Sequence, residues 1–267
     1  MKRTMESSFK GILYPARLPA FHRFPAPASV AELVQWFWIP EWDIEPGRTS
    51  RQHLIAYPSC NLVVQPDGVA FSGPTTRAAH RDLHGKGWAV GALLRPAAVP
   101  LFTDDPGSLR DTEVDFPAEE LRLSVSDAMN AYDGGTHRER AVEAFVGWLA
   151  SVAGPAMSEE ALLANRLMDV VASDASLVRV EDAASALAVS TRTLQRVAKK
   201  FIGLSPAALI RRRRLQDAAE RARLDPGVDL SVLAAELGYA DHAHLTNDFR
   251  KYLGFTPSTY RQAVAGD

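Results

Sequence analysis

The sequence predicts an α+β fold in which a β-rich, barrel-like domain is followed by helices and then by an all-α domain. Most of the 17 prolines and four of the five tryptophans lie in the first 116 residues, among short apolar runs. From Pro117 onward the apolar spacing becomes helical, and the last third of the chain contains one pattern twice. A chain of 267 residues has room for two domains of ordinary size.

The β-rich domain is expected over residues 1–116. Its apolar runs are short and are separated by turn signals such as "PDG", "SGP" and "GKG". Runs of this length between Gly- and Pro-rich turns are typical of antiparallel strands. The runs are "LVQWFWIP", "HLIAYPS", "CNLVVQ" and "GWAVGALL".

A helical segment is expected over 117–155, and the all-α domain over 156–267. The stretches "AEELRLSVSDAMNAY" and "RERAVEAFVGWLASVA" have helical spacing, and "DGGT" marks the break between them. Pro155 and the helix-start pattern of "SEEALLANRLMDVVASD" then open a series of short helices that continues to the end of the sequence.

The net charge of −2 conceals a basic stretch. Between Ser190 and Arg223 there are ten Lys and Arg residues but only two Asp and Glu residues, an excess that favours a polyanionic partner. A single cysteine, Cys60, excludes an intramolecular disulfide and a thiolate-rich zinc site, and it favours a reducing compartment. No signal-peptide pattern and no run of about 20 apolar residues is present. We therefore expect a soluble, cytoplasmic protein with no membrane partner.

Three groups of reactive side chains are weak candidates for catalysis or metal binding. His80 and His84 lie in "HRDLH", whose strand-like context does not place them on one helical face. Asp104 and Asp105 precede a proline in "TDDPG", which is typical of a turn. Cys60 lies in an apolar run and is expected to be a packed thiol. We expect no catalytic residue, no metal and no cofactor.

The all-α domain contains the repeated pattern. In each copy a short helix ("VEDAASALA"; "LSVLAAELG") leads through a tight turn ("AVS"; "GYAD") into a second helix ("TRTLQRVAKKFI"; "DHAHLTNDFRKYL"). Ser190 and Asp241 are suited to cap the N-termini of the two second helices. Leu194, Gly203 and Pro206 of the first copy recur 51 positions later as Leu245, Gly254 and Pro257.

Each second helix has an apolar face and a polar, largely basic face. A short helix, a sharp turn and a second helix with a basic outer face is the helix-turn-helix plan, in which the second helix lies in the major groove of DNA. An ordinary helical bundle with solvated faces is the alternative, but two units in register favour the first interpretation. The outer-face residues are Arg192, Arg196, Lys199 and Lys200 in the first copy and Ala243, Asn247, Arg250 and Lys251 in the second.

These residues carry a resemblance to a known family. The first copy supplies "STRTLQR" and "GLSP", and the second supplies "AAELGYADHAHLTNDFRKYLGFTPSTYR". Together they resemble the DNA-binding domain of AraC/XylS-type transcription regulators, over about 100 residues from Ser158 to Ala263. The resemblance implies two helix-turn-helix units joined by a long helix, here "SPAALIRRRRLQDAAERARL", that places the recognition helices about one DNA turn apart.

The resemblance also implies which side chains contact DNA. Arg192, Gln195 and Arg196 are expected to contact bases or phosphates in one half-site. His242, His244 and Asn247 are expected in the other half-site. The remaining four basic residues lie farther along the two helices and suit phosphate; they are Lys199, Lys200, Arg250 and Lys251.

Three features depart from a simple reading of that pattern. Ala198 occupies the position of the aromatic Phe249 in the second copy, so the first unit is expected to pack on Phe201 instead. Asn247 stands where the family often has arginine, which favours adenine over guanine because an amide pairs with adenine N6 and N7. The run of arginines from 211 to 214 spans a full helical turn, so all four cannot face DNA. Arg213 is the expected structural member, and the others are expected to be solvated or near phosphates.

The two histidines "HAH" after Asp241 cannot form a metal site on a helix. His242 and His244 point about 200° apart around the helix axis, so they cannot bind one ion. We expect both to be candidate DNA contacts. His242 lies closer to the apolar face and is the more readily packed of the two, which makes His244 and Asn247 the better candidates.

The first half more weakly resembles the β-rich sensor domains of the same regulator class, through "YPSCNLVV", "GPTTR" and "GALLRPAAVPLF". The resemblance implies a barrel-like, cupin-related domain that binds a small effector or mediates dimerisation, with the helices between Glu119 and Val152 as a candidate homodimer face. Aromatic side chains suit a pocket for a small organic ligand, although core packing is the simpler explanation for each. The pocket candidates are Trp36, Trp38, Tyr57 and Trp88.

The sequence thus predicts a DNA-binding transcription regulator that is not an enzyme and that recognises two adjacent half-sites in double-stranded DNA. If it is an activator, RNA polymerase is a further partner. One alternative is an enzyme or repair protein tethered to DNA by the helical domain, but alkyl-acceptor chemistry needs more cysteine than Cys60. Another is a basic protein-interaction module, which differs in that its binding does not discriminate between DNA sequences.

Overall fold

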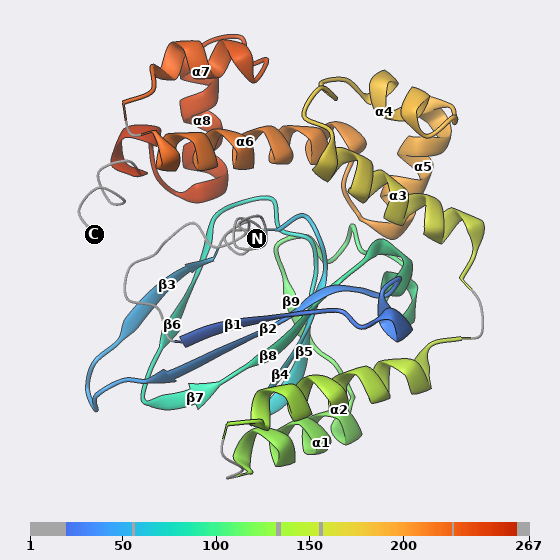
Figure 1. The fold of residues 1–267 in the computed structure, drawn as a ribbon, viewed down its shortest axis with the longest axis vertical. Coiled ribbons are helices and arrows are strands. Elements are labelled where there is room, and N and C mark those ends of the chain that lie inside the picture. Colours follow the sequence, from blue (N-terminus) through green and yellow to red (C-terminus); the bar gives the residue numbers. More distant parts are fainter. Residues whose placement is uncertain (1–19, 55–56, 132–134, 155–156, 226, 261–267) are drawn as a thin grey trace, which may run out of the picture.

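The computed structural model describes residues 20–54, 57–131, 135–154, 157–225 and 227–260. The break expected at "DGGT", Pro155 and the last residues of the resemblance lie wholly or partly outside these ranges. Figure 1 shows a β-rich half with two helices on its lower side and an all-α half above it. The predicted α+β class, with strands first and helix-turn-helix units last, is confirmed.

The described residues of the β-rich half form two antiparallel sheets. The larger sheet has the strand order β1-β2-β8-β4-β5-β9, and β7 pairs with β2. The smaller sheet pairs β3 with β6. The strands are β1 (Ala20–Pro25), β2 (Val34–Asp43), β3 (Ser50–Leu54), β4 (Asn61–Gln65), β5 (Gly68–Ser72), β6 (Ala79–Leu83), β7 (Lys86–Trp88), β8 (Val90–Leu94) and β9 (Glu113–Asp115).

One face of the larger sheet is covered by α1 (Glu119–Asn130) and α2 (His137–Val152). Phe37 of β2 packs edge-on against Phe145 of α2, with ring centroids 5.5 Å apart. Leu121, Val125 and Leu149 are buried in the same core as the strands. The helices expected as a separate segment therefore share their hydrophobic core with the sheet, because each has one apolar stripe that only the sheet can cover.

Within the described residues, the all-α half contains six helices, and α6 connects two compact units (Figure 1). Leu194 and Phe201 are buried in the first unit, and Leu245, Phe249 and Tyr260 in the second. Phe201 thus supplies the bulk that Ala198 lacks, as expected. The helices are α3 (Glu159–Ser173), α4 (Val180–Ala186), α5 (Thr191–Phe201), α6 (Pro206–Leu224), α7 (Leu230–Glu236) and α8 (His242–Leu253).

Both predicted N-caps are present. Ser190 Oγ accepts a hydrogen bond from Thr193 N at 3.1 Å, and Asp241 Oδ1 accepts one from His244 N at 2.7 Å. The turn that precedes each capped helix contains a residue with positive φ, which is Ala188 at 53° in the first unit and Gly238 at 71° in the second. The caps and turns fix the direction in which α5 and α8 leave their units.

The two halves are joined through η2 (Ala28–Val30), the segment after it, η3 (Pro96–Leu101) and α3. The buried side chain of Asn165 on α3 accepts a hydrogen bond from Ala97 N at 2.9 Å and donates to the Glu32 carbonyl at 2.9 Å. Arg95 and Asp169 add an ion pair at 2.6 Å. Beyond α5, a Cβ on Gly203 would lie 2.7 Å from the backbone of Pro106, so the first unit closely approaches the β-rich half there. No helix among the described residues is long and apolar enough to cross a membrane.

Candidate nucleic-acid interface

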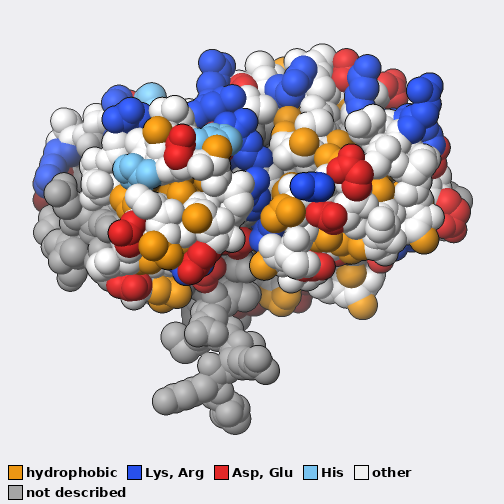
Figure 2. All heavy atoms as spheres, turned by 90° about the horizontal axis from the view of Figure 1, so that it is seen from above, with side chains coloured by type: hydrophobic (Ala, Val, Ile, Leu, Met, Phe, Trp, Pro, Cys, Tyr) orange, Lys and Arg blue, Asp and Glu red, His pale blue; other side chains and the backbone are white. Residues whose placement is uncertain are grey.

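The first recognition helix, α5, has the two faces that its sequence predicts. Leu194, Val197 and Ala198 are fully buried. The polar face is exposed, and Figure 2 shows Lys and Arg side chains gathered along one edge of the helical half and in the middle of its face. Its exposed residues are Arg192, Gln195, Arg196, Lys199 and Lys200.

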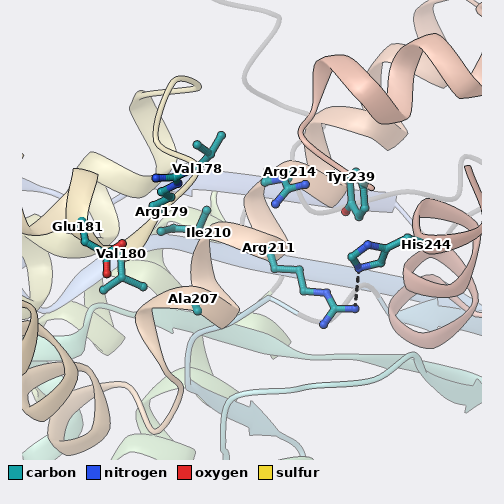
Figure 3. Close-up of a pocket in the computed structure, with 10 residues that line it drawn as sticks. All are labelled: Val178, Arg179, Val180, Glu181, Ala207, Ile210, Arg211, Arg214, Tyr239 and His244. Atoms are coloured by element: carbon teal, nitrogen blue, oxygen red, sulfur yellow. Dashed lines mark hydrogen bonds between the residues drawn. The ribbon is translucent and has the colours of Figure 1, made fainter. Parts of the chain in front are cut away.

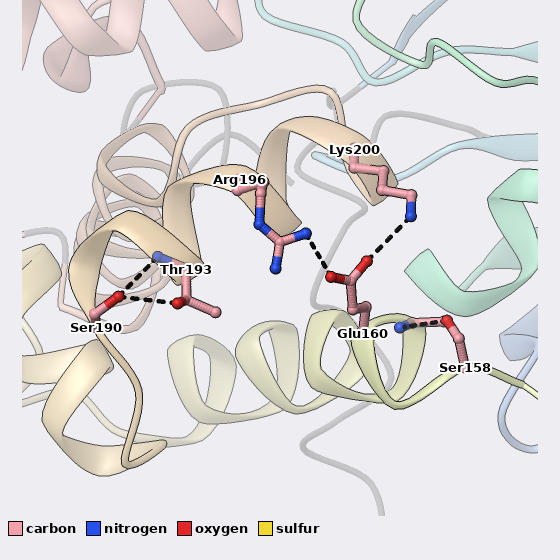
Figure 4. Close-up of polar contacts among 7 residues, drawn as sticks. Ser158, Glu160, Ser190, Thr193, Arg196 and Lys200 are labelled. Atoms are coloured by element: carbon pink, nitrogen blue, oxygen red, sulfur yellow. Dashed lines mark hydrogen bonds and ion pairs between the residues drawn. The ribbon is translucent and has the colours of Figure 1, made fainter.

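Two of these residues are already paired within the chain. Glu160 of α3 accepts a hydrogen bond from the Arg196 guanidinium through Oε1, and its Oε2 lies 3.0 Å from Lys200 Nζ (Figure 4). The hydrogen bonds from Arg196 and Lys200 hold the pKa of Glu160 below its ordinary value. The sequence did not predict this pairing, because α4 lies between α3 and α5 in the chain and no short motif links the two helices.

The second recognition helix, α8, also exposes its predicted contact residues. His242, His244 and Asn247 are exposed, as are the two basic residues of its last turn, Arg250 and Lys251. His242 Nε2 lies 3.3 Å from Thr246 Oγ1, one turn later in the same helix. The ring of His244 meets Tyr239 edge-on at 5.2 Å, and its Nε2 lies 3.4 Å from a terminal nitrogen of Arg211. His244, the preferred candidate of the two, is therefore the one with more contacts inside the protein.

The inner face of α8 contains a buried charge that sequence reasoning missed. Asp248 is 1% exposed, and its carboxylate accepts hydrogen bonds from Arg211 of α6, one of them 2.6 Å from Nε to Oδ2. The bonds to Asp248 raise the pKa of Arg211. An acidic residue three positions after the buried Leu245 was the available signal, because that spacing places it on the inner face.

Two of the four consecutive arginines, and not one as expected, are buried. Arg213 is buried and bonds to Asp217 at 2.7 Å and to the Leu177 carbonyl at 2.9 Å, which fits its expected structural role. Arg212 was expected to be solvated or near phosphate, and that is wrong. It is 3% exposed, lies over the ring of Tyr252 at 4.5 Å, and has its pKa lowered to about 10 by burial.

The aromatic candidates for an effector pocket lie on both faces of the large sheet. Trp36 meets Tyr57 edge-on at 5.2 Å, on the face of β2 opposite the buried Phe37. Trp38 shares that face, and its Nε1 donates to Asn61 Oδ1 at 3.1 Å. Trp88 pairs across the strands with Glu41 and packs against the core beneath α2, on the other face. The structure brings Trp36 and Tyr57 together and places Trp88 apart from them.

The reactive groups outside the helical half have structural surroundings. His80 lies in β6, and His84 Nδ1 is 3.2 Å from Thr49 Oγ1. Cys60 is buried, which raises the pKa of its thiol to about 12. Among the residues that the structure describes, no group of three or more His, Cys, Asp or Glu side chains is placed to bind a metal ion.

Two family models match the chain. Residues 183–263 match a family described as "Helix-turn-helix domain". Residues 22–115 match a "Domain of unknown function (DUF6597)". The two matches fall on the two halves of the fold.

Similar proteins include a "Putative AraC-like transcription regulator" of Streptomyces antibioticus and another of Streptomyces lividans. Each is 32% identical over 126 residues, which is 47% of this chain and 39% of the relative. The chain thus spans about two fifths of the length of these relatives. An "Uncharacterized HTH-type transcriptional regulator" of Haemophilus influenzae is 31% identical over 86 residues, 32% of this chain and 28% of the relative.

Among solved structures, the fold is similar to ToxT of Vibrio cholerae. One ToxT structure has a TM-score of 0.45 at 13% identity and covers 86% of this chain and 99% of its own. The AraC-like activator CuxR gives a TM-score of 0.23 at 13% identity, covering 76% of this chain and 95% of its own. By its repeat, its two capped second helices and its family match, the helical half of this chain is a helix-turn-helix domain. Its sequence is similar to that of AraC-like transcription regulators.

Proposed function

We propose that the protein is a sequence-specific DNA-binding transcription regulator. The observation that carries this proposal is the pair of recognition helices, α5 and α8, at the two ends of α6, each capped and each with an exposed basic face. A single basic helix suits any polyanion, but two in register suit two successive major-groove segments on one side of a duplex.

The exposed residues divide by chemistry into two roles. Side chains near the N-terminus of each recognition helix reach base edges, and basic side chains in the last turn reach phosphates. The proposed base contacts are Arg192, Gln195 and Arg196 in one half-site and His242, His244 and Asn247 in the other. Lys199, Lys200, Arg250 and Lys251 are the proposed phosphate contacts.

Regulation is proposed to come from the β-rich half. It contacts the first DNA-binding unit through α3, so a small effector bound to it, or dimerisation through α1 and α2, reaches Glu160 and hence Arg196. The cytoplasm is the proposed location, and RNA polymerase the partner if the protein activates transcription.

The test is genome-wide mapping of bound sites, followed by binding measurements on the recovered site and on a scrambled duplex over a range of salt concentrations. Lys199→Ala is expected to weaken binding to both duplexes alike and to flatten the salt dependence by about one unit of slope. Arg196→Ala is expected to weaken binding to the recovered site by about 1–3 kcal/mol more than to the scrambled one. Equal losses from both variants on both duplexes would show that the two roles are wrongly assigned, and binding without sequence discrimination would favour a general polyanion-binding module.

Asn247 has its own test, because an amide prefers adenine. Substituting each base pair under α8 in the recovered site is expected to reveal one position where only adenine gives full affinity, and Asn247→Ala is expected to abolish that preference. A scan without an adenine preference under this helix would count against the role of Asn247.

A further inference from the structure

The two helix-turn-helix units enclose a cleft on the first half of α6. Its volume is about 310 Å³, and its walls come from both units (Figure 3). The segment entering α4 lines one side, and the turn before α8 lines the other. The lining residues are Val178, Arg179, Val180, Glu181, Ala207, Ile210, Arg211, Arg214, Tyr239 and His244.

The two sides of the cleft differ in the side chains that line them. Val178, Val180 and Ile210 lie toward the first unit, together with one residue of each charge, Arg179 and Glu181, while Arg214 and His244 lie toward the second (Figure 3). A volume of this size lined by both apolar and polar side chains is large enough for a small organic molecule. Two arginines, Arg211 and Arg214, line the end of the cleft toward the second unit, so a ligand with a negative charge fits it best.

In the part of the chain that the structure describes, Arg214 lacks the acidic partner that Arg211 has. Arg211 is paired with Asp248, but the structure shows no ion pair between Arg214 and any residue that it describes. Arg214 donates through Nε to the Leu237 carbonyl and lies over the ring of Tyr239 at 4.5 Å. One of its terminal nitrogens is buried and has no hydrogen-bond partner among the described residues. Arg214 therefore brings to the cleft a positive charge that forms no ion pair among the described residues, and an anion is the strongest acceptor for a guanidinium.

We propose that this cleft binds a small organic carboxylate. The carboxylate accepts hydrogen bonds from the terminal nitrogens of Arg214 and Arg211, and the apolar body of the ligand lies along Val178, Val180 and Ile210. A phosphate of the DNA backbone is the other anion available at this surface, but its sugar neighbours are polar and leave the apolar wall uncovered. Because the ligand touches both units, we expect it to alter the spacing of α5 and α8 on DNA. This expected effect, unlike binding itself, rests on the proposed function.

The experiment uses the full chain, with 4-phenylbutyrate as the probe and 4-phenylbutanol as an uncharged probe of similar shape. Calorimetric titration without DNA is expected to show saturable binding of the carboxylate to one site per chain, at least tenfold tighter than the alcohol. Arg214→Met preserves the length of the side chain but not its charge, and it is expected to lower the affinity for the carboxylate at least tenfold. Arg221→Met, on the same helix but outside the cleft, is the matched control and is expected to leave that affinity unchanged.

A second variant keeps the test decisive if Arg214→Met does not fold. Ala207 is exposed on α6, so Ala207→Trp fills the cleft without disturbing a core and is expected to abolish binding of the carboxylate. Equal binding of the two probes, or unchanged binding by both variants, would overturn the proposal. No probe binding together with a flatter salt dependence of DNA binding in Arg214→Met would assign the cleft to a DNA phosphate instead. Because the titration contains no DNA, a chain that binds the carboxylate but no DNA would overturn the proposed function and leave this site standing.

Discussion

The two helix-turn-helix units have the same backbone plan but are stabilised in different ways. At positions 51 residues apart, the first unit buries Val197 and the second buries Asp248. The first unit contacts the β-rich half through α3, η3 and the turn at Gly203, whereas the end of α8 contacts it through the Lys251 carbonyl, which accepts from Ala78 N at 3.1 Å. Both units have an apolar core, but the first has the more extensive contact with the β-rich half, and the second adds a buried ion pair to α6.

The largest difference is expected at the two glycines that end the recognition helices. Gly203 and Gly254 both have positive φ, at 76° and 79°. A Cβ on Gly203 would lie 2.7 Å from the backbone of Pro106 and Gly107. Among the described residues, a Cβ on Gly254 would meet only Ala78 Cβ, at 3.4 Å. Gly203→Ala is therefore expected to lower the free energy of unfolding by about 2–4 kcal/mol, and Gly254→Ala by about 1 kcal/mol.

Denaturant unfolding of the full chain measures both values. Equal losses from the two glycine variants would mean that the contact between Gly203 and the β-rich half contributes nothing to stability.

The second largest effect is expected at the ion pair between Asp248 and Arg211, which only the second unit has at this position. Asp248→Ala removes the acceptor from Arg211 and is expected to cost about 2–3 kcal/mol of unfolding free energy. The double variant Asp248→Val with Arg211→Met gives the second unit the chemistry of Val197, and it is expected to recover most of that loss, because apolar replacements of buried pairs are often neutral.

Thermal and denaturant unfolding of the single and double variants provide the measurement. A double variant as unstable as Asp248→Ala alone would show that the second unit requires the charge itself and not merely a filled site.

A smaller and reciprocal effect is expected at the turns before the recognition helices. Gly238 adopts positive φ without strain, whereas Ala188 adopts a similar φ with a Cβ. Gly238→Ala is expected to destabilise the second unit by about 1 kcal/mol, and Ala188→Gly to stabilise the first by about 0.5–1 kcal/mol. Opposite shifts of the unfolding midpoint test this pair, and shifts of the same sign would contradict it.

The smallest effect on stability, but a direct one on binding, is expected at Glu160. Glu160→Gln releases Arg196 and Lys200, so DNA affinity at low salt is expected to rise severalfold while stability changes little. Glu159→Gln, at the neighbouring exposed position, is the control and is expected to have no such effect.

The ion pairs of Glu160 with Arg196 and Lys200 also predict a dependence on pH. The pKa of Glu160 is lowered in the folded protein, so its ion pairs persist down through the ordinary carboxylate range and are lost only as the pH falls through the lowered value. Titration of this carboxylate by NMR at low salt provides the measurement. An ordinary pKa for Glu160 would show that the contact with Arg196 does not persist in solution.

The features that could be predicted from the sequence are those set by residues close together in the chain. The caps at Ser190 and Asp241, the buried faces of α5 and α8 and the strand-rich first half all follow from spacing and turn chemistry. The sequence did not predict Glu160 beside Arg196 or Asp248 beside Arg211, which lie 36 and 37 positions apart in sequence. Such pairs depend on how helices dock, and periodicity within one helix contains no information about its neighbour.

The arginines from 211 to 214 also show that contacts between elements could not be predicted from the sequence. Helical geometry alone established that four consecutive arginines cannot all face DNA. Which of them are buried depends on the rings of Tyr252 and Tyr239 and on the carbonyls of Leu177 and Leu237, all contributed by other elements.

Asn165 has a mechanical consequence for the joint between the two halves. Its amide bonds the backbones of Ala97 and Glu32 and also the Glu32 carboxylate, at 2.8–2.9 Å, so a single side chain fastens two separate segments of the β-rich half. A shift of α3 along the β-rich half would break these bonds and leave a buried amide without partners, which costs free energy. Asn165 therefore fixes the register of α3 against both segments at once.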